Sequence, residues 1–171
     1  MSTAKKAEGS PTPNNNPIFD KRVIEAFSNG LRETLQMMAQ VDVNFETARI
    51  ENQWQKVGDV SGLIEFKSPP FAGSIYIHLP KEILFHVYEQ MVGEKYTELS
   101  KDVLDSIGEI SNMAYGVAKG KLNPLGFEFN MSIPKVCLTA DLNRVPGIPH
   151  LLIPFSIQSR KCQLEILIHK L

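Results

Sequence analysis

The chain has 171 residues, of which 43% are hydrophobic, and this is enough for one domain with a substantial core, preceded by a tail. The formal net charge of −1 gives no electrostatic reason to expect binding to nucleic acid or to an anionic membrane. The N-terminus has no apolar stretch for export and no run approaches the ~20 apolar residues of a membrane span, so we expect a cytoplasmic protein without a membrane segment.

The N-terminal part divides into a tail and a first helix. Residues 1–16 contain no large apolar side chain after the initial methionine and are rich in Ser, Pro, Asn and Lys. We therefore expect a disordered tail there and a folded domain at residues 17–171. The first helix should begin near Pro17, because Asn16 is a suitable N-cap and proline is favoured at the first helical position. Apolar residues at helical spacing extend this helix to about Gln40.

Three strands and a short helix should follow. Residues 41–50 alternate in part between apolar and polar side chains, which is typical of a strand. Residues 57–66 and 71–79 have strand-like composition on either side of a proline-containing connection, and they predict a hairpin. A short helix should then begin at Pro80 and end before Gly93, which is suited to the position after a helix.

The second half predicts a long helix and three further strands. The helix should run from its candidate N-cap Ser100 to about Leu122. The strands should lie within 127–138, 150–158 and 162–169. The order suggests two similar halves, each a long helix followed by three strands. We therefore predict an α+β fold in which two long helices pack on a mainly antiparallel six-stranded sheet, with one short extra helix.

The long helix carries a polar stripe away from its apolar face. At about 100° per residue, the stripe consists of Asp105, Glu109, Asn112, Gly116 and Lys119. Glycine inside a helix costs about 1 kcal/mol relative to alanine. Gly116 therefore indicates either that another molecule approaches the helix backbone beside Asn112, or that two helices pack closely there. Taken alone, a Glu and an Asn three residues apart on a helix are most often only solvated.

Other catalytic and metal-binding patterns are absent from the sequence. Cys137 and Cys162 lie beside apolar residues, as buried free thiols do, and no Cys/His cluster predicts a metal site. The histidines show no ligand spacing, no serine lies in a GxSxG motif, and no glycine-rich phosphate loop is present. Trp54 lies in the polar segment NQWQ and is either a lid or partner contact or a packing residue.

The long helix carries the pattern E-x-x-N-M-x-x-G-x-x-K, with Pro134 about twenty residues further on. It belongs to a set of segments that occur in a fixed order: GDVSG at 58–62, FAGSIYIHLP at 71–80, EISNMAYGVAKGKL at 109–122, FEFNMSIPKV at 127–136 and LLIPF at 151–155. Together these segments resemble the chemotaxis phosphatases of the CheC/CheX/FliY family, and most closely those of the CheX type, with the helix pattern as the strongest signal. The resemblance covers the chain from about Pro17 onwards.

The resemblance implies a protein phosphatase that hydrolyses the aspartyl-phosphate of a CheY-like response regulator. The family's active Glu and Asn map onto Glu109 and Asn112, and Asp105 matches an acidic or serine position. Asn112 is expected to orient the attacking water, and Glu109 to pair with the regulator's active-site lysine. No cofactor of its own is implied, because the divalent metal, Mg, belongs to the regulator. Gly116 would let the regulator come near, and Lys119 would either contact an acidic rim or remain solvated.

CheC-type members of the family carry a second active pair on the first helix. Here Glu25 is followed by Ser28 and Asn29, so the spacing is broken and one active site is expected. The resemblance also implies a homodimer. Two alternatives stay open: a non-catalytic module that binds a regulator or resembles the flagellar-switch proteins, and a small-molecule sensor domain, for which the sequence has no ligand motif.

Overall fold

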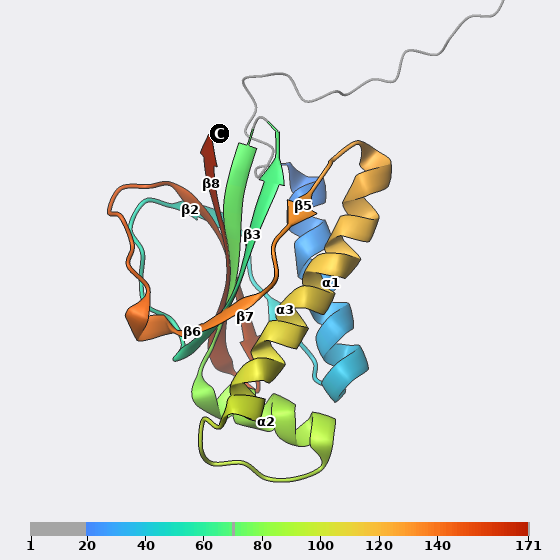
Figure 1. The fold of residues 1–171 in the computed structure, drawn as a ribbon, viewed down its shortest axis with the longest axis vertical. Helices are drawn as coiled ribbons and strands as arrows, with labels where there is room; N and C mark the ends of the chain where they lie inside the picture. Colours follow the sequence, from blue (N-terminus) through green and yellow to red (C-terminus); the bar gives the residue numbers. More distant parts are fainter. Residues whose placement is uncertain (1–19, 70, 171) are drawn as a thin grey trace, which may run out of the picture.

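The computed structural model describes residues 20–69 and 71–170, and it places the helices on one face of a single sheet (Figure 1). The predicted tail lies outside the described residues. The first helix, α1 (Lys21–Ala39), begins later than the predicted start near Pro17. Asp20 is its N-cap, and the Asp20 carboxylate accepts a hydrogen bond of 2.9 Å from the backbone N–H of Arg22. This bond satisfies one of the unpaired donors at the helix start.

The other two helices follow the prediction. α2 (Lys81–Val92) ends at Gly93, whose φ of 80° lies in the left-handed region that glycine adopts without strain. α3 (Lys101–Leu122) begins after Ser100, whose hydroxyl accepts from the backbone N–H of Val103 at 3.4 Å. Local sequence signals therefore set the bounds of both helices.

The sheet is antiparallel at every described pairing, and the predicted α+β class is confirmed. In the described part of the chain it has eight strands where six were predicted, because two predicted strands are each split into two short ones. The main order is β1-β7-β8-β4-β3-β5, with β2 also on β7 and β6 also on β3. The strands are β1 (Asn44–Phe45), β2 (Arg49–Glu51), β3 (Val60–Ser68), β4 (Phe71–Leu79), β5 (Asn130–Met131), β6 (Lys135–Leu138), β7 (His150–Ile157) and β8 (Arg160–Lys170).

Both splits are β-bulges, where two residues of one strand face a single residue of the next. Ile153 of β7 faces residues 47–48, between β1 and β2. Ile64 of β3 faces residues 133–134, between β5 and β6. A proline adjoins each site, Pro154 on β7 and Pro134 within the second bulge, and proline has no N–H to continue a ladder. The alternation of side chains alone does not show such an interruption.

The two predicted halves are visible in the sheet order. Each half contributes a long helix, a pair of short strands and a hairpin. The short strands pair with the hairpin of the other half: β1 and β2 lie on β7, while β5 and β6 lie on β3. The hairpins β3–β4 and β7–β8 meet in the middle through β4 and β8. The halves are thus interlocked and share one core.

Two glycines allow α3 to lie close to its neighbours. A Cβ on Gly30 of α1 would stand 2.4 Å from the carbonyl oxygen of Ala114, so α1 and α3 touch there through their backbones. A Cβ on Gly62 of β3 would stand 2.1 Å from the hydroxyl of Ser111, which instead donates to the carbonyl of Ile107 at 2.7 Å. These contacts fix the rotation of α3 about its axis, so the side opposite them faces solvent.

The other face of the sheet carries a chain of buried hydrogen bonds. His78 donates from Nε2 to the Glu165 carboxylate at 3.0 Å, since a carboxylate can only accept. Its Nδ1 then accepts from the Ser61 hydroxyl at 2.7 Å, and Thr139 donates to Ser61 at 2.7 Å. Arg144 forms an ion pair with the same carboxylate. A buried charge is thereby both paired and hydrogen-bonded.

Arg144 also joins the two loops that cover this face. Its guanidinium lies 4.0 Å from the ring centroid of Tyr76 and 5.5 Å from that of Trp54. Both distances are within the range of cation–π attraction. Trp54 is half-buried in this contact. Of the alternatives left open by the sequence, packing within the domain is the role that the structure shows for this tryptophan.

Acid should weaken the fold through His78. Burial lowers the pKa of His78, against the opposing effect of Glu165, so the unfolded chain takes up the proton more readily than the folded protein. Above about pH 6.5 neither state is protonated and the group contributes no pH dependence. Below it, the free energy of unfolding should fall by up to about 1.4 kcal/mol per pH unit until the folded pKa is reached.

Urea denaturation between about pH 7.5 and pH 5.5 measures this effect. In His78→Gln, the free energy of unfolding should fall less steeply with falling pH. The matched control is His86→Gln, because His86 is a half-buried histidine of α2, and this variant should keep the wild-type pH dependence. An unchanged slope in His78→Gln would contradict the assignment, whatever the stability of that variant at neutral pH.

Candidate functional site

The polar stripe of α3 lies on the solvent side of the helix. Asp105, Glu109, Asn112 and Gly116 are exposed and Lys119 is half-buried. The apolar residues of the same helix are buried against α1 and the sheet. The structure therefore brings the five residues of the predicted site together on one accessible side of a rigid helix.

The side chains of the stripe are engaged to different degrees. Asp105 forms an ion pair of 3.6 Å with Lys101, and because both side chains are exposed this pair contributes little to stability. Glu109 and Asn112 have no side-chain hydrogen bond or ion pair with the residues that the structure describes. A carboxylate and a carboxamide one helical turn apart are thus available to another molecule.

Gly116 leaves an opening beside Asn112. Among the described residues, a Cβ placed on Gly116 would meet no atom within 4 Å, whereas one placed on Gly30 would collide with the backbone of α3. Gly116 therefore does not serve the packing of two helices within the described residues, where the close contact between α1 and α3 is at Gly30. What Gly116 provides is an uncovered stretch of helix backbone on the solvent side.

The segment leading into β6 runs alongside α3 (Figure 1). A Cβ on Gly108 would stand 3.2 Å from Val136 Cγ2 and 4.0 Å from Pro134 Cβ. Gly108 and Asn112 are one turn apart, so they are neighbours on the helix surface. The bulged segment therefore forms a wall beside Asn112. The sequence had marked Pro134 as part of a motif but not as a neighbour of the stripe.

α1 does not repeat this arrangement. Glu25 pairs with Lys21 at 3.3 Å. The Asn29 carboxamide oxygen accepts a hydrogen bond from Arg32 at 2.8 Å. Ser28, which has a shorter side chain, is three residues after Glu25, the position that Asn112 has after Glu109. The long arginine also fills surface that is open at Gly116 on α3. We therefore place the candidate site on α3 alone.

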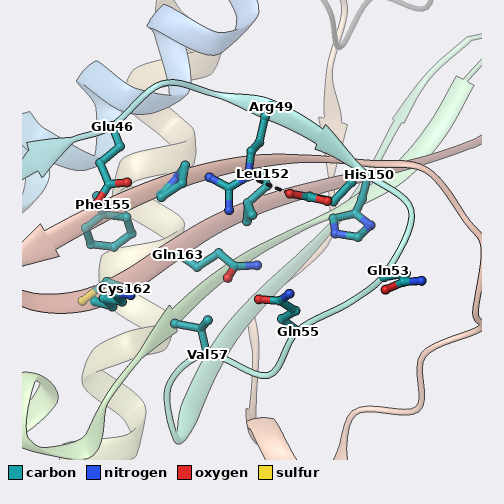
Figure 2. A pocket seen from close by; sticks show the side chains of 13 residues that line it. Glu46, Arg49, Gln53, Gln55, Val57, His150, Leu152, Phe155, Cys162 and Gln163 are labelled. Carbon is teal, nitrogen blue, oxygen red and sulfur yellow. Dashed lines mark hydrogen bonds and ion pairs between the residues drawn. The ribbon is translucent and has the colours of Figure 1, made fainter.

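A separate pocket of about 190 Å³ lies under the segment that carries β1 and β2, on the face of the sheet away from the helices (Figure 2). Its lining mixes charges of both signs with amides, including the buried Gln163. Arg49 and Glu51 are hydrogen-bonded to each other there at 2.7 Å. No residue of the α3 stripe lines this pocket, and the sheet separates the two.

The described part of the chain has no cluster of metal-ligand side chains and no activated thiol. Within residues 20–69 and 71–170, no three His, Cys, Asp or Glu side chains gather as metal ligands would. Burial raises the pKa of Cys162 to about 12 and also raises the pKa of Cys137, so both thiols stay protonated at neutral pH. In the same residues, no helix combines the length and apolar character needed to cross a membrane.

The chain matches one protein family and several solved structures. The family is described as chemotaxis phosphatase CheX, and its model matches residues 60–156. No curated protein matches the sequence. The chemotaxis protein CheX from Vibrio vulnificus is 30% identical with a TM-score of 0.78, and the match covers 86% of this chain and 99% of that one.

Two further structures share the fold. A CheC-like superfamily protein from Shewanella sp. PV-4 is 27% identical with a TM-score of 0.79, covering 88% of this chain and 99% of that one. The chain from a CheX-CheY-BeF3-Mg complex of Borrelia burgdorferi is 22% identical with a TM-score of 0.69, covering 86% of this chain and 98% of that one. At that identity the second likeness shows the fold alone.

Proposed function

We propose, since the chain belongs to the chemotaxis phosphatase CheX family, that it hydrolyses the aspartyl-phosphate of a CheY-like response regulator. The carboxamide of Asn112, which is exposed and has no hydrogen-bond partner within residues 20–69 and 71–170, is the observation that carries the proposal. It stands on a rigid helix, one turn from Glu109 and beside the open backbone of Gly116. In the docked complex this side of α3 enters the regulator's active site.

Asn112 acts on the attacking water. An acyl phosphate is already activated, and its hydrolysis passes through a loose transition state that needs a water in line with the breaking P–O bond more than it needs a strong base. The amide oxygen of Asn112 accepts a hydrogen bond from that water, while the amide nitrogen donates to a neighbouring acceptor. Fixing the water in this way contributes several kcal/mol to catalysis.

Glu109 anchors the complex. A carboxylate is a poor neighbour for a phosphoryl group, because like charges repel. Its partner is instead the lysine of the regulator's active site, in a charge-assisted hydrogen bond. The divalent metal belongs to the regulator and neutralises charge on the phosphoryl oxygens. The Borrelia complex of a CheX with CheY, BeF3 and Mg supports a partner of this kind.

Glu109→Ala should weaken docking more than it changes the fold. Losing a charge-assisted hydrogen bond of about 1.5–3 kcal/mol raises the KM for the phosphorylated regulator about 10- to 100-fold. Glu98→Ala, exposed just before α3, is the control and should leave the KM unchanged. Steady-state phosphate release at increasing regulator concentration measures both variants. A Glu109→Ala protein with unaltered KM and turnover would remove Glu109 from the site.

Gly116→Ala should raise stability while it lowers activity. The added methyl group has room within this chain, so the better helix propensity should stabilise the fold by about 1 kcal/mol. On the regulator's side the same methyl group obstructs close approach. Gly120→Ala is the control, because a Cβ there also meets nothing within 4 Å among the described residues, but it lies about two helical turns beyond Asn112, near the end of α3. Equal activity of both variants in a phosphate-release assay would show that nothing approaches Gly116.

Measuring phosphate loss from candidate regulators, with and without the protein, tests the proposed function directly. Faster loss supports a phosphatase. Binding to an activated regulator without faster loss would support the non-catalytic alternative. We also propose that the protein is cytoplasmic and forms a homodimer, as its likeness to CheX-like proteins implies. Analytical ultracentrifugation tests the second point, and a monomer at all concentrations would refute it.

A further inference from the structure

We propose that Ile133 is a second docking element for the response regulator, an apolar knob that enters an apolar site beside the regulator's phosphorylated aspartate. The inference rests on the proposed function and names a further contact of the same surface. Ile133 is 85% exposed, which is more than any other large apolar residue that the structure describes. Exposing an isoleucine to this extent forgoes the stabilisation that its burial brings.

The β-bulge is what turns Ile133 outward. Ser132 is held opposite Glu65, because its N–H donates to the Glu65 carbonyl at 2.8 Å and its hydroxyl accepts from the Glu65 N–H at 3.1 Å. Pairing resumes at Lys135, opposite Leu63. Between these points Ile133 is the extra residue. Bulges of this kind redirect a side chain and are frequent next to active sites.

The knob is rigid and adjoins the stripe. Pro134 fixes its own φ and restricts the preceding Ile133 to extended backbone. Pro134 packs toward Gly108, one helical turn before Asn112, and consecutive Cα atoms are about 3.8 Å apart. Beyond the bulge, β6 is held by the hydrogen bond from the Thr139 N–H to the Asp59 carbonyl at 2.8 Å. A partner that covers Asn112 therefore also meets Ile133.

The fold itself does not require an apolar side chain there. The equivalent bulge of the first half, opposite Ile153, contains Thr47 and Ala48. Thr47 is exposed and polar, while Ala48 packs against the core. Both halves therefore have the bulge, but of the two described bulges only the one beside the polar stripe of α3 contains a large apolar residue. Continuity with that stripe identifies the occupant as the regulator.

The test is binding of CheY-like regulators from the same organism, activated with beryllofluoride and Mg. Ile133→Ser should raise the Kd about tenfold or more, since the variant loses the burial of a large aliphatic side chain. The KM for phosphate release should rise by a similar factor, with kcat nearly unchanged. Val145→Ser is the matched control, because Val145 is 70% exposed on a loop over the opposite face and should bind as the wild type does.

The outcomes separate this inference from the proposed function. If the wild type binds a regulator and Ile133→Ser binds equally well, the docking role of Ile133 is refuted while the phosphatase proposal stands. If the wild type neither binds nor dephosphorylates any regulator, both proposals fail. If Ile133→Ser instead dissociates a dimer at unchanged regulator affinity, the residue belongs to an interface between two copies and the inference is overturned. A raised Kd with wild-type thermal stability supports it.

Discussion

Replacing Asn112 with alanine should slow the stimulated loss of phosphate from the regulator by about a hundredfold or more. The alanine has no amide to hold the attacking water, and positioning of this kind contributes several kcal/mol. Because Asn112 is exposed and has no partner among the described residues, its removal should leave the fold unchanged. The effect should appear in kcat, with the affinity for the activated regulator close to that of the wild type.

Single-turnover decay of the phosphorylated regulator measures the rate, and thermal denaturation checks the fold. Asn52→Ala is the matched control, since Asn52 is an exposed asparagine between Glu51 and Gln53, which line the pocket on the face of the sheet away from the helices. A variant that keeps more than about half of the wild-type rate would rule out water positioning by Asn112. The site would then have to be reassigned, whereas the description of the fold would stand, because the fold does not depend on this residue.

Replacing Arg144 with leucine should cost about 3–5 kcal/mol of folding stability. The substitution leaves Glu165, whose side chain is 1% exposed, without its ion-pair partner in the interior. It also removes the guanidinium that joins the rings of Tyr76 and Trp54. This face of the sheet is away from the stripe, so the remaining folded protein should keep the proposed phosphatase activity per molecule.

A second substitution distinguishes lost charge pairing from lost packing. Adding Glu165→Gln to Arg144→Leu removes the unpaired carboxylate and should recover part of the stability. Urea denaturation of the wild type, both single variants and the double variant measures the coupling. If the double variant is as unstable as the sum of the two single variants, the ion pair contributes nothing and packing accounts for the loss.

Much of the helical framework was predictable because the relevant signals are local. Ser100 caps α3, and Gly93 ends α2. The 3.6-residue period then assigns each position of α3 to the buried or the exposed side without reference to the rest of the chain. Glu109 and Asn112 were placed correctly on the exposed side for this reason, and the same segment carried the resemblance to the family.

The sheet was predicted less well, because strand pairing depends on residues far apart in the sequence. The split at Ile133 follows from the register between β3 and two short strands. The split opposite Pro154 follows from the register on β7. Alternation of side chains within one segment does not contain this register. The prediction of six strands therefore missed the interruptions and counted each divided strand once.

By itself, the sequence determined the helices, the polar stripe, the α+β class and the family, since each follows from spacing or motif along a continuous segment. Only the tertiary structure decided between the two explanations of Gly116, because Gly30, far away in sequence, occupies the helix contact. It alone showed the contact of Arg144 with Tyr76 and Trp54, and Ile133 beside the stripe. Those placements depend on which surfaces meet once the core is buried, and burial is a property of the whole chain.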